Sequence, residues 1–209
     1  VPDVRFRLSS LEATEVDARL RDLFGDARRL VPHLHAPLQA GSDRVLKRMG
    51  RHWYTASSYA RSVEQLLKGR AVFALGADVI AGFPGETDSD HRLTCALVER
   101  LPFTYLHVFP FSLRPGTAAE RLPAHVPASI VRERAAELRA LGERKRQAYL
   151  AQRSGGSADV IVVRGDVREG LSEDYLEVRL EGSPLPRGSR VAAQLHLTGS
   201  TLLATPMVA

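Results

Sequence analysis

The run from Asp78 to Thr87 constrains the fold more than any other segment of this chain. An apolar strand leads into a turn that contains Gly82 and Gly85, and a helix follows, which Thr87 can cap. In an α/β protein such a junction lies at the carboxyl end of a strand, where ligands bind. Glycine lets a ligand approach the backbone closely. An ordinary strand–turn–helix connection would produce the same pattern, so this segment alone leaves both interpretations open.

The same alternation of strand and helix recurs before and after this segment. Strand patterns occupy residues 4–8, 33–38, 79–82 and 104–109, and helical spacing occupies most of the chain between them. Strands that alternate with helices favour a parallel sheet with crossover helices. In such a sheet the turns after all four strands lie at one edge, and here they are polar or rich in glycine: 9–12, 39–43, 82–87 and 112–117.

The pattern changes after about residue 141. A long basic helix ends near Arg153, a Ser-Gly-Gly-Ser linker follows, and strand patterns then occupy residues 159–163, 175–180, 191–197 and 200–205. Short strands separated by turns are typical of a small antiparallel barrel. We therefore expect an α/β protein, with a partial parallel (β/α) barrel over residues 1–143 and a small all-β antiparallel barrel over residues 144–209.

The composition is that of an ordinary folded protein, with 44% hydrophobic and 25% charged residues among 209. No apolar run approaches the roughly 20 residues that span a bilayer, so no membrane association is expected. The single cysteine, Cys95, lies among apolar helix positions and is expected to be a core residue, and a chain without disulfides fits a reducing compartment. A beginning at Val1, close to a strand, suggests a fragment or a processed chain.

The formal charge of +5 is distributed unevenly. Basic residues gather in the helix before residue 153, and three of them are consecutive: Arg144, Lys145 and Arg146. Such a stripe can bind a phosphate backbone, and it can equally be the solvated face of a helix.

Three long segments carry a resemblance to a known family: residues 32–49, 78–87 and 109–119. In this order they resemble the radical S-adenosylmethionine (SAM) methylthiotransferases, and the C-terminal module looks like the TRAM domain of that family. His-Leu-His before Pro-Leu-Gln at 37–39, and His-Val-Phe-Pro-Phe-Ser before Arg-Pro-Gly-Thr at 114–117, are most similar to the branch that modifies tRNA threonylcarbamoyladenosine. The chain departs from the family pattern at Ala40, where Ser is common, and at Ala118, where Pro is usual.

The resemblance implies methylthiolation of threonylcarbamoyladenosine at tRNA position 37, next to the anticodon, with SAM and 4Fe–4S clusters as cofactors. The family binds its catalytic cluster through three cysteines after the first strand of the core, and Cys95 alone cannot build such a site. We therefore expect the chain to hold the C-terminal portion of the core plus the TRAM-like domain, and to be inactive alone, with no catalytic residue or metal ligand. His33 and His35 share a strand face, a spacing that can bind metal, but no third ligand is evident.

The resemblance also implies which residues contact the cofactor and the RNA. SAM is expected between the turns at one edge of the sheet, against Ser10, Gln39, Ser42, Ile80, Gly82 and Phe83. An alternative role for Ser42 is to cap the next helix. An RNA phosphate is expected at Arg114, Thr117, Arg144, Lys145 and Arg146. For Arg114 and Thr117 the carboxylate of the substrate is an alternative ligand.

The expected partner is the tRNA anticodon stem–loop, bound by a monomer in the cytoplasm. A methylthiotransferase that acts on isopentenyladenosine tRNA or on a ribosomal protein is an alternative, and so is a catalytically inactive tRNA-binding fragment. A part-barrel enzyme of another family, acting on a phosphorylated metabolite, would leave the three ordered motifs unexplained.

Overall fold

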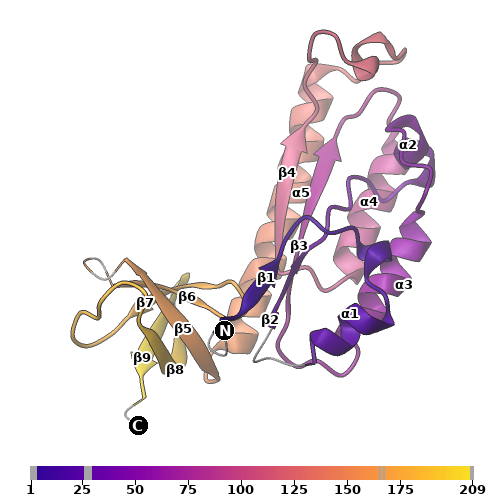
Figure 1. The fold of residues 1–209 in the computed structure, drawn as a ribbon. Coiled ribbons are helices and arrows are strands. Elements are labelled where there is room, and N and C mark those ends of the chain that lie inside the picture. Colours follow the sequence, from indigo (N-terminus) through magenta and orange to yellow (C-terminus); the bar gives the residue numbers. More distant parts are fainter. Residues whose placement is uncertain (1–3, 26–29, 165, 167, 208–209) are drawn as a thin grey trace.

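The computed structural model describes residues 4–25, 30–164, 166 and 168–207. Its N-terminal part is a parallel sheet in the order β1-β2-β3-β4, which confirms the predicted α/β class (Figure 1). Consecutive units of a (β/α) barrel have this sequential order. The strands are β1 (Phe6–Leu8), β2 (Leu30–His35), β3 (Ala74–Ala81) and β4 (Tyr105–Pro110).

Helices connect the strands, and capping residues decide where several of them begin. The Thr87 hydroxyl accepts the Asp90 N–H, and the Asp90 carboxylate accepts the Thr87 N–H at 2.8 Å, so the predicted capping box starts α4. Thr55 and Ser58 start α3 in the same way. The helices are η1 (Ala13–Glu15, 3-10), α1 (Ala18–Leu23), α2 (Asp43–Arg48), α3 (Ala56–Leu67), α4 (Asp88–Arg100), η2 (Ala118–Arg121, 3-10) and α5 (Ala128–Arg153).

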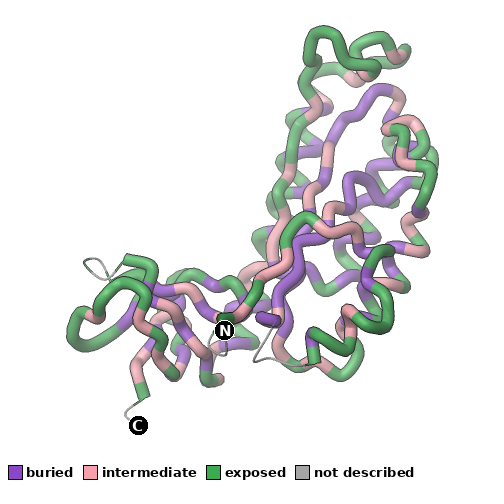
Figure 2. Tube along the Cα trace, viewed as in Figure 1, coloured by how far each residue is buried: buried purple, intermediate pink, exposed green. Residues whose placement is uncertain are grey.

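The two faces of the sheet differ in chemistry. Alternation along β3 places Leu75, Ala77 and Val79 in a hydrophobic core together with residues of α3, α4 and α5. On the opposite face Asp78 contacts His35 and His107. Buried residues follow β2, β3 and the inner sides of α3 and α4, while β1, β4 and the loop beyond β4 are more exposed (Figure 2).

The C-terminal part is a closed barrel in the order β5-β6-β7-β9-β8. Every neighbouring pair is antiparallel except β7 and β9, which are parallel, so the prediction of a purely antiparallel barrel is wrong in this detail. Strand directions cannot alternate all the way round a ring of five, so at least one pair must be parallel. The strands are β5 (Ser157–Arg164), β6 (Glu169–Ser172), β7 (Glu177–Leu180), β8 (Arg190–Thr198) and β9 (Thr201–Pro206).

The helix α5 joins the two parts. It contains 26 residues and is therefore about 39 Å long. Its last turn contacts the barrel, because Tyr149 Oη donates to Asp174 Oδ2 at 2.7 Å and Arg153 Nε donates to the same oxygen at 2.7 Å. The predicted boundary between residues 143 and 144 lies within this helix and stays a prediction. None of the helices in the described ranges has the length and apolar character that crossing a membrane requires.

Candidate functional site

The turns after the strands lie at the carboxyl edge of the sheet, because all four strands are parallel (Figure 1). Hydrogen bonds link neighbouring turns there: the Leu11 N–H donates to His35 O at 3.2 Å, and the Ile80 N–H donates to Gln39 O at 2.9 Å. The Phe111 N–H donates to Ala81 O at 2.8 Å. The segments that the sequence pattern singled out are therefore adjacent in space.

The residues predicted to contact SAM differ in exposure. Ser10 is exposed and Ile80 is half-buried, whereas the other four are buried: Gln39, Ser42, Gly82 and Phe83. Gln39 has a φ of 67°, in the left-handed region, and its N–H donates to Asp78 O at 2.8 Å. Phe83 packs edge-on against Phe111, with ring centroids 5.3 Å apart. Contact between any of these residues and SAM stays a prediction.

Ser42 connects two helices. Its hydroxyl donates to Asp90 Oδ1 at 2.6 Å and, in the described structure, makes no capping hydrogen bond to α2. Burial alone would raise the pKa of Asp90, but hydrogen bonds from Arg44, Ser42 and Thr87 outweigh it and hold the pKa well below its usual range. Asp90 is therefore an ionised anchor between α2 and α4, a role that the capping-box pattern alone does not reveal.

The two glycines of the central turn accommodate protein rather than an open space. A Cβ on Gly82 would lie 2.5 Å from Val131 Cγ2 of α5, and a Cβ on Gly85 would lie 2.6 Å from Arg48 Nε. Both residues also have positive φ, 76° and 82°. Close packing of Val131 on Gly82 and the left-handed backbone at both positions are thus a sufficient reason for these glycines.

A buried ion pair supports the same turn. Glu86 Oε2 accepts the Gly82 N–H at 3.1 Å, and Glu86 Oε1 accepts a hydrogen bond from Arg134 Nη1 at 2.8 Å. Burial raises the pKa of Glu86, while Arg134 and the Gly82 N–H oppose that shift. Glu86 therefore ties the turn to α5, a contact between distant segments that sequence spacing does not predict.

The residues predicted to bind RNA fall into two separate groups. Arg114 and Thr117 are exposed in the loop beyond β4, where the Thr117 hydroxyl donates to Arg114 O at 2.8 Å. The other three lie in the last part of α5, about 20 Å along the helix from Val131 and the carboxyl edge: Arg144, Lys145 and Arg146. The structure does not bring these two groups into one patch.

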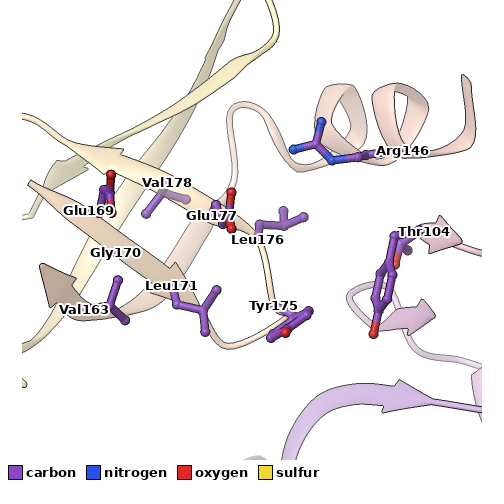
Figure 3. Close-up of a pocket in the computed structure, with 11 residues that line it drawn as sticks. Thr104, Arg146, Val163, Glu169, Gly170, Leu171, Tyr175, Leu176, Glu177 and Val178 are labelled. Atoms are coloured by element: carbon purple, nitrogen blue, oxygen red, sulfur yellow. The ribbon is translucent and has the colours of Figure 1, made fainter. Parts of the chain in front are cut away.

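The three consecutive basic residues of α5 face α4 and the barrel. Lys145 Nζ donates to Glu99 O at 2.7 Å, Arg144 lies 3.5 Å from the Glu99 carboxylate, and burial lowers the pKa of Lys145. Arg146 lines a cavity of about 590 Å³ between the sheet and the barrel (Figure 3). Thr104 and Tyr105 line it from the sheet side, and its barrel lining is Val163, Glu169, Gly170, Leu171, Tyr175, Leu176, Glu177 and Val178.

The polar face of the sheet brings together side chains from three strands that sequence reasoning did not connect. Asp78 Oδ1 lies 3.1 Å from His35 Nε2 and 3.2 Å from His107 Nδ1. His35 could therefore share a metal ion with Asp78 of β3 and His107 of β4, and His33 is not part of this group. His33 Nε2 instead lies 2.9 Å from Tyr105 Oη, and burial together with Arg7 lowers the pKa of His33 to about 3. Polar residues at alternate positions of otherwise apolar strands were the signal available in the sequence.

Comparison with known proteins identifies the family. No family model matches the chain. The threonylcarbamoyladenosine tRNA methylthiotransferase of Aquifex aeolicus is 35% identical over 176 residues, 84% of this chain, and that of Treponema pallidum is 38% identical over 203 residues, 96% of this chain. The chain belongs to the methylthiotransferase family. It spans 42% of the length of each of these two relatives.

A methylthiotransferase of another substrate class is almost as similar. The tRNA-2-methylthio-N(6)-dimethylallyladenosine synthase of Agrobacterium fabrum is 34% identical over 203 residues, which is 95% of this chain and 44% of that protein. The resemblance to the family is thus confirmed, and the relatives named for threonylcarbamoyladenosine include those of Thermotoga maritima and Bacillus subtilis.

The residues of this chain do not fit an iron–sulfur cluster. Such clusters are held by several cysteine thiolates, and Cys95 is the single cysteine. It lies on α4 beside His91, and burial raises its pKa to about 11, which favours the neutral thiol. The prediction that this chain lacks the cluster ligands follows from this count.

Proposed function

We propose that this chain forms part of a tRNA methylthiotransferase that modifies threonylcarbamoyladenosine at position 37. The observation that carries the proposal is the 35–38% identity to proteins of that name over most of the chain. We assign the parallel sheet to a partial (β/α) barrel of the radical SAM type and the closed barrel to a TRAM-like domain. The sequential strand order and the adjacent turns support the first assignment.

The carboxyl edge is the proposed cofactor surface. SAM, together with a reduced cluster held outside this chain, supplies the radical chemistry of the family. In this chain Ser10 and Ile80 present the more exposed groups of the edge, and the backbone around Gln39 is held in an unusual conformation beside Ile80. The buried Ser42–Asp90 and Glu86–Arg134 contacts fix the shape of the turns, so that their backbone groups meet a ligand without reorganisation.

The basic end of α5 and the barrel are the proposed RNA surface. Arg144 and Arg146 keep part of their side chains exposed, and both stand beside the barrel end of the helix. Guanidinium and ammonium groups bind phosphates and release counterions. Arg114 and Thr117, at the other end of the molecule, are proposed to contact the modified nucleotide or a phosphate near it. The tRNA anticodon stem–loop would therefore contact both ends of α5.

A second candidate function of the isolated chain is to bind tRNA without catalysing a reaction. The observation that favours it is the single cysteine, which cannot hold a cluster. We expect the 209-residue chain to be colourless and to leave SAM uncleaved under reducing conditions. Reductive cleavage of SAM by this chain would contradict that expectation.

The test of the proposed activity is the nucleoside content of tRNA. The gene that encodes this chain, expressed from its natural start in cells without their own methylthiotransferases, should produce 2-methylthio-threonylcarbamoyladenosine, measured by mass spectrometry. Methylthiolation of isopentenyladenosine alone would assign the other substrate class. No methylthiolated nucleoside at all would contradict the proposed function.

A further inference from the structure

Three side chains from three neighbouring strands meet on the polar face of the sheet. Asp78 of β3 is the register partner of His107 on β4, and His35 of β2 is the register partner of Gly76, one step before Asp78 on the same face. The ligand atoms of the three residues all lie within 4.8 Å of one another. Since each comes from a different strand of a hydrogen-bonded sheet, the backbone fixes their spacing.

Neighbouring residues orient the two imidazoles. The Tyr105 ring lies over Gly76, where a Cβ would be 1.9 Å from Tyr105 Cζ, so the glycine makes room for the ring. Tyr105 stacks on His35 at 6.1 Å with an interplanar angle of 11°, and its centroid is 5.3 Å from that of His107. Packing against one tyrosine thus limits the rotation of both histidines.

The cluster is open on one side. The exposed fraction of the side chain rises from 9% for His35 to 25% for Asp78 and 56% for His107. An ion could reach the three ligand atoms from the side of His107, and its remaining coordination positions would point to solvent.

We propose that His35, Asp78 and His107 bind one divalent transition-metal ion. Two imidazoles and one carboxylate are a ligand set for Zn²⁺ and for related borderline ions such as Co²⁺ and Fe²⁺. With metal–ligand bonds of about 2.0–2.1 Å, two ligands lie about 2.9 Å apart at a right angle and about 3.4 Å apart at the tetrahedral angle. The observed 3.1 and 3.2 Å between Asp78 and the two histidines fall between these values. The two imidazole nitrogens lie within 4.8 Å of each other, so binding requires at most that they approach to a similar distance.

The chemistry that this ion offers follows from its charge. One carboxylate neutralises half of a divalent charge, and the open positions then attract water or an anionic oxygen ligand. The site is inferred from side-chain geometry and does not depend on the proposed tRNA modification. Without an ion, the same three residues form a hydrogen-bonded chain in which both imidazoles donate to Asp78. The test must distinguish this hydrogen-bonded chain from a metal site.

A second group provides an internal comparison. His91 and Cys95 of α4 and Glu137 of α5 also lie within 4.8 Å of one another. His91 Nε2 is 2.7 Å from Glu137 Oε2, and the Cys95 thiol is 3.5 Å from the same nitrogen. The raised pKa of Cys95 disfavours the thiolate that a metal requires, so this group is the weaker one.

The experiment is a titration of the purified 209-residue chain with Co²⁺, followed by its visible ligand-field absorption. We expect one equivalent to bind and to be displaced by Zn²⁺. His107→Gln and Asp78→Asn should each weaken binding at least about 10-fold, since even indirect changes around metal ligands cost 10- to 100-fold. His91→Gln and His125→Gln should bind Co²⁺ like the parent chain, and circular dichroism checks that every variant is folded.

A second measurement needs no variant. Diethylpyrocarbonate modifies accessible histidines, and saturating Zn²⁺ should slow modification of His107 while leaving His125 unchanged, as read by mass spectrometry of peptides. Absence of saturable Co²⁺ binding would overturn the proposal and leave the hydrogen-bonded chain. Binding that survives His107→Gln and Asp78→Asn but is lost in His91→Gln would overturn it in favour of the second group.

Discussion

At the scale of single residues, buried polar contacts between distant segments hold the carboxyl edge in shape. Ser42 reaches Asp90 across 48 positions of the chain, and Arg134 reaches Glu86 across the same separation. Removing one partner of such a pair leaves the other without compensation in a site with little water, so these residues are expected to be sensitive to substitution.

Asp90→Asn should lower the free energy of unfolding by about 1–3 kcal/mol, because the neutral amide is a weaker acceptor for Arg44, Ser42 and Thr87. Folding lowers the pKa of Asp90, so the native state binds fewer protons than the unfolded state around the ordinary value of 3.8. The stabilisation is therefore complete above that pH and is lost as the pH falls below it. Urea unfolding between pH 6 and pH 3 measures both effects.

The exposed Asp22 supplies the control for this prediction. Asp22→Asn should change stability by less than about 0.5 kcal/mol. A parent protein and an Asp90→Asn variant that lose stability equally between pH 6 and pH 3 would contradict the role given to Asp90.

Gly82→Ala should be more destabilising than Gly182→Ala. Both glycines have positive φ, 76° and 83°, so either alanine carries a backbone cost of about 1–2 kcal/mol. The new methyl group collides with Val131 at Gly82, whereas a Cβ on Gly182 has no atom of the described residues within 4 Å. The collision should add about 1–3 kcal/mol. Equal unfolding free energies of the two variants would show that α5 moves aside.

At the scale of elements, α5 is anchored to the barrel by a buried arginine. Arg153 donates to Asp174, whose side chain is fully buried, and also lies 3.2 Å from the Glu173 carboxylate. Tyr149 donates to the same Asp174 oxygen. The end of the helix and the turn between β6 and β7 therefore form one polar unit inside the protein.

Arg153→Ala should destabilise the barrel by about 3–5 kcal/mol, because it leaves Asp174 buried without its cation. Arg164→Ala is the matched control, since Arg164 forms an exposed ion pair with Glu169 at 3.5 Å. The exposed fraction is 62% for the Arg164 side chain and 50% for that of Glu169. That loss should stay below about 1 kcal/mol. Hydrogen exchange reports the two parts separately, and barrel amides should lose protection in Arg153→Ala more than the amides of β3. Equal effects of the two variants would contradict the anchor.

At the scale of the whole molecule, one predicted RNA-binding group lies in the loop that precedes α5 and the other in the C-terminal half of that helix. A stem–loop bound at both ends would bridge the parallel sheet and the barrel. The affinity for RNA should then depend on basic residues near the barrel as well as on the loop beyond β4.

Replacing Arg144, Lys145 and Arg146 together by alanine should weaken binding of an anticodon stem–loop and flatten its dependence on salt. Each lost phosphate contact lowers the slope of log K against log salt by about 0.7–0.9. Fluorescence anisotropy of a labelled stem–loop measures both quantities. A triple alanine variant of exposed arginines elsewhere, Arg19, Arg61 and Arg92, removes the same charge and should retain most of the affinity and slope. Equal losses in both variants would indicate binding by net charge alone.

Local patterns in the sequence predicted the local features of this fold. The alternation of strand and helix, the Thr87–Asp90 capping box and the closeness of the turns all follow from short-range spacing and from the geometry of parallel strands. Strand β6 was not predicted, because Glu-Gly-Leu-Ser has weak strand preference. The contacts that decide the chemistry could not be predicted, because the registers that join His35, Asp78 and His107, and the packing of Val131 on Gly82, depend on segments far apart in the chain.

The continuous course of α5 has a consequence for distance. A helix of 26 residues has no joint at which the barrel could swing, and each residue sets about 1.5 Å. The helix therefore sets a fixed distance between the barrel and the carboxyl edge of the sheet. Lengthening it by whole turns would move the barrel away from that edge in steps of about 5.4 Å, and if the proposed RNA contacts are correct, a different nucleotide would then lie at the edge.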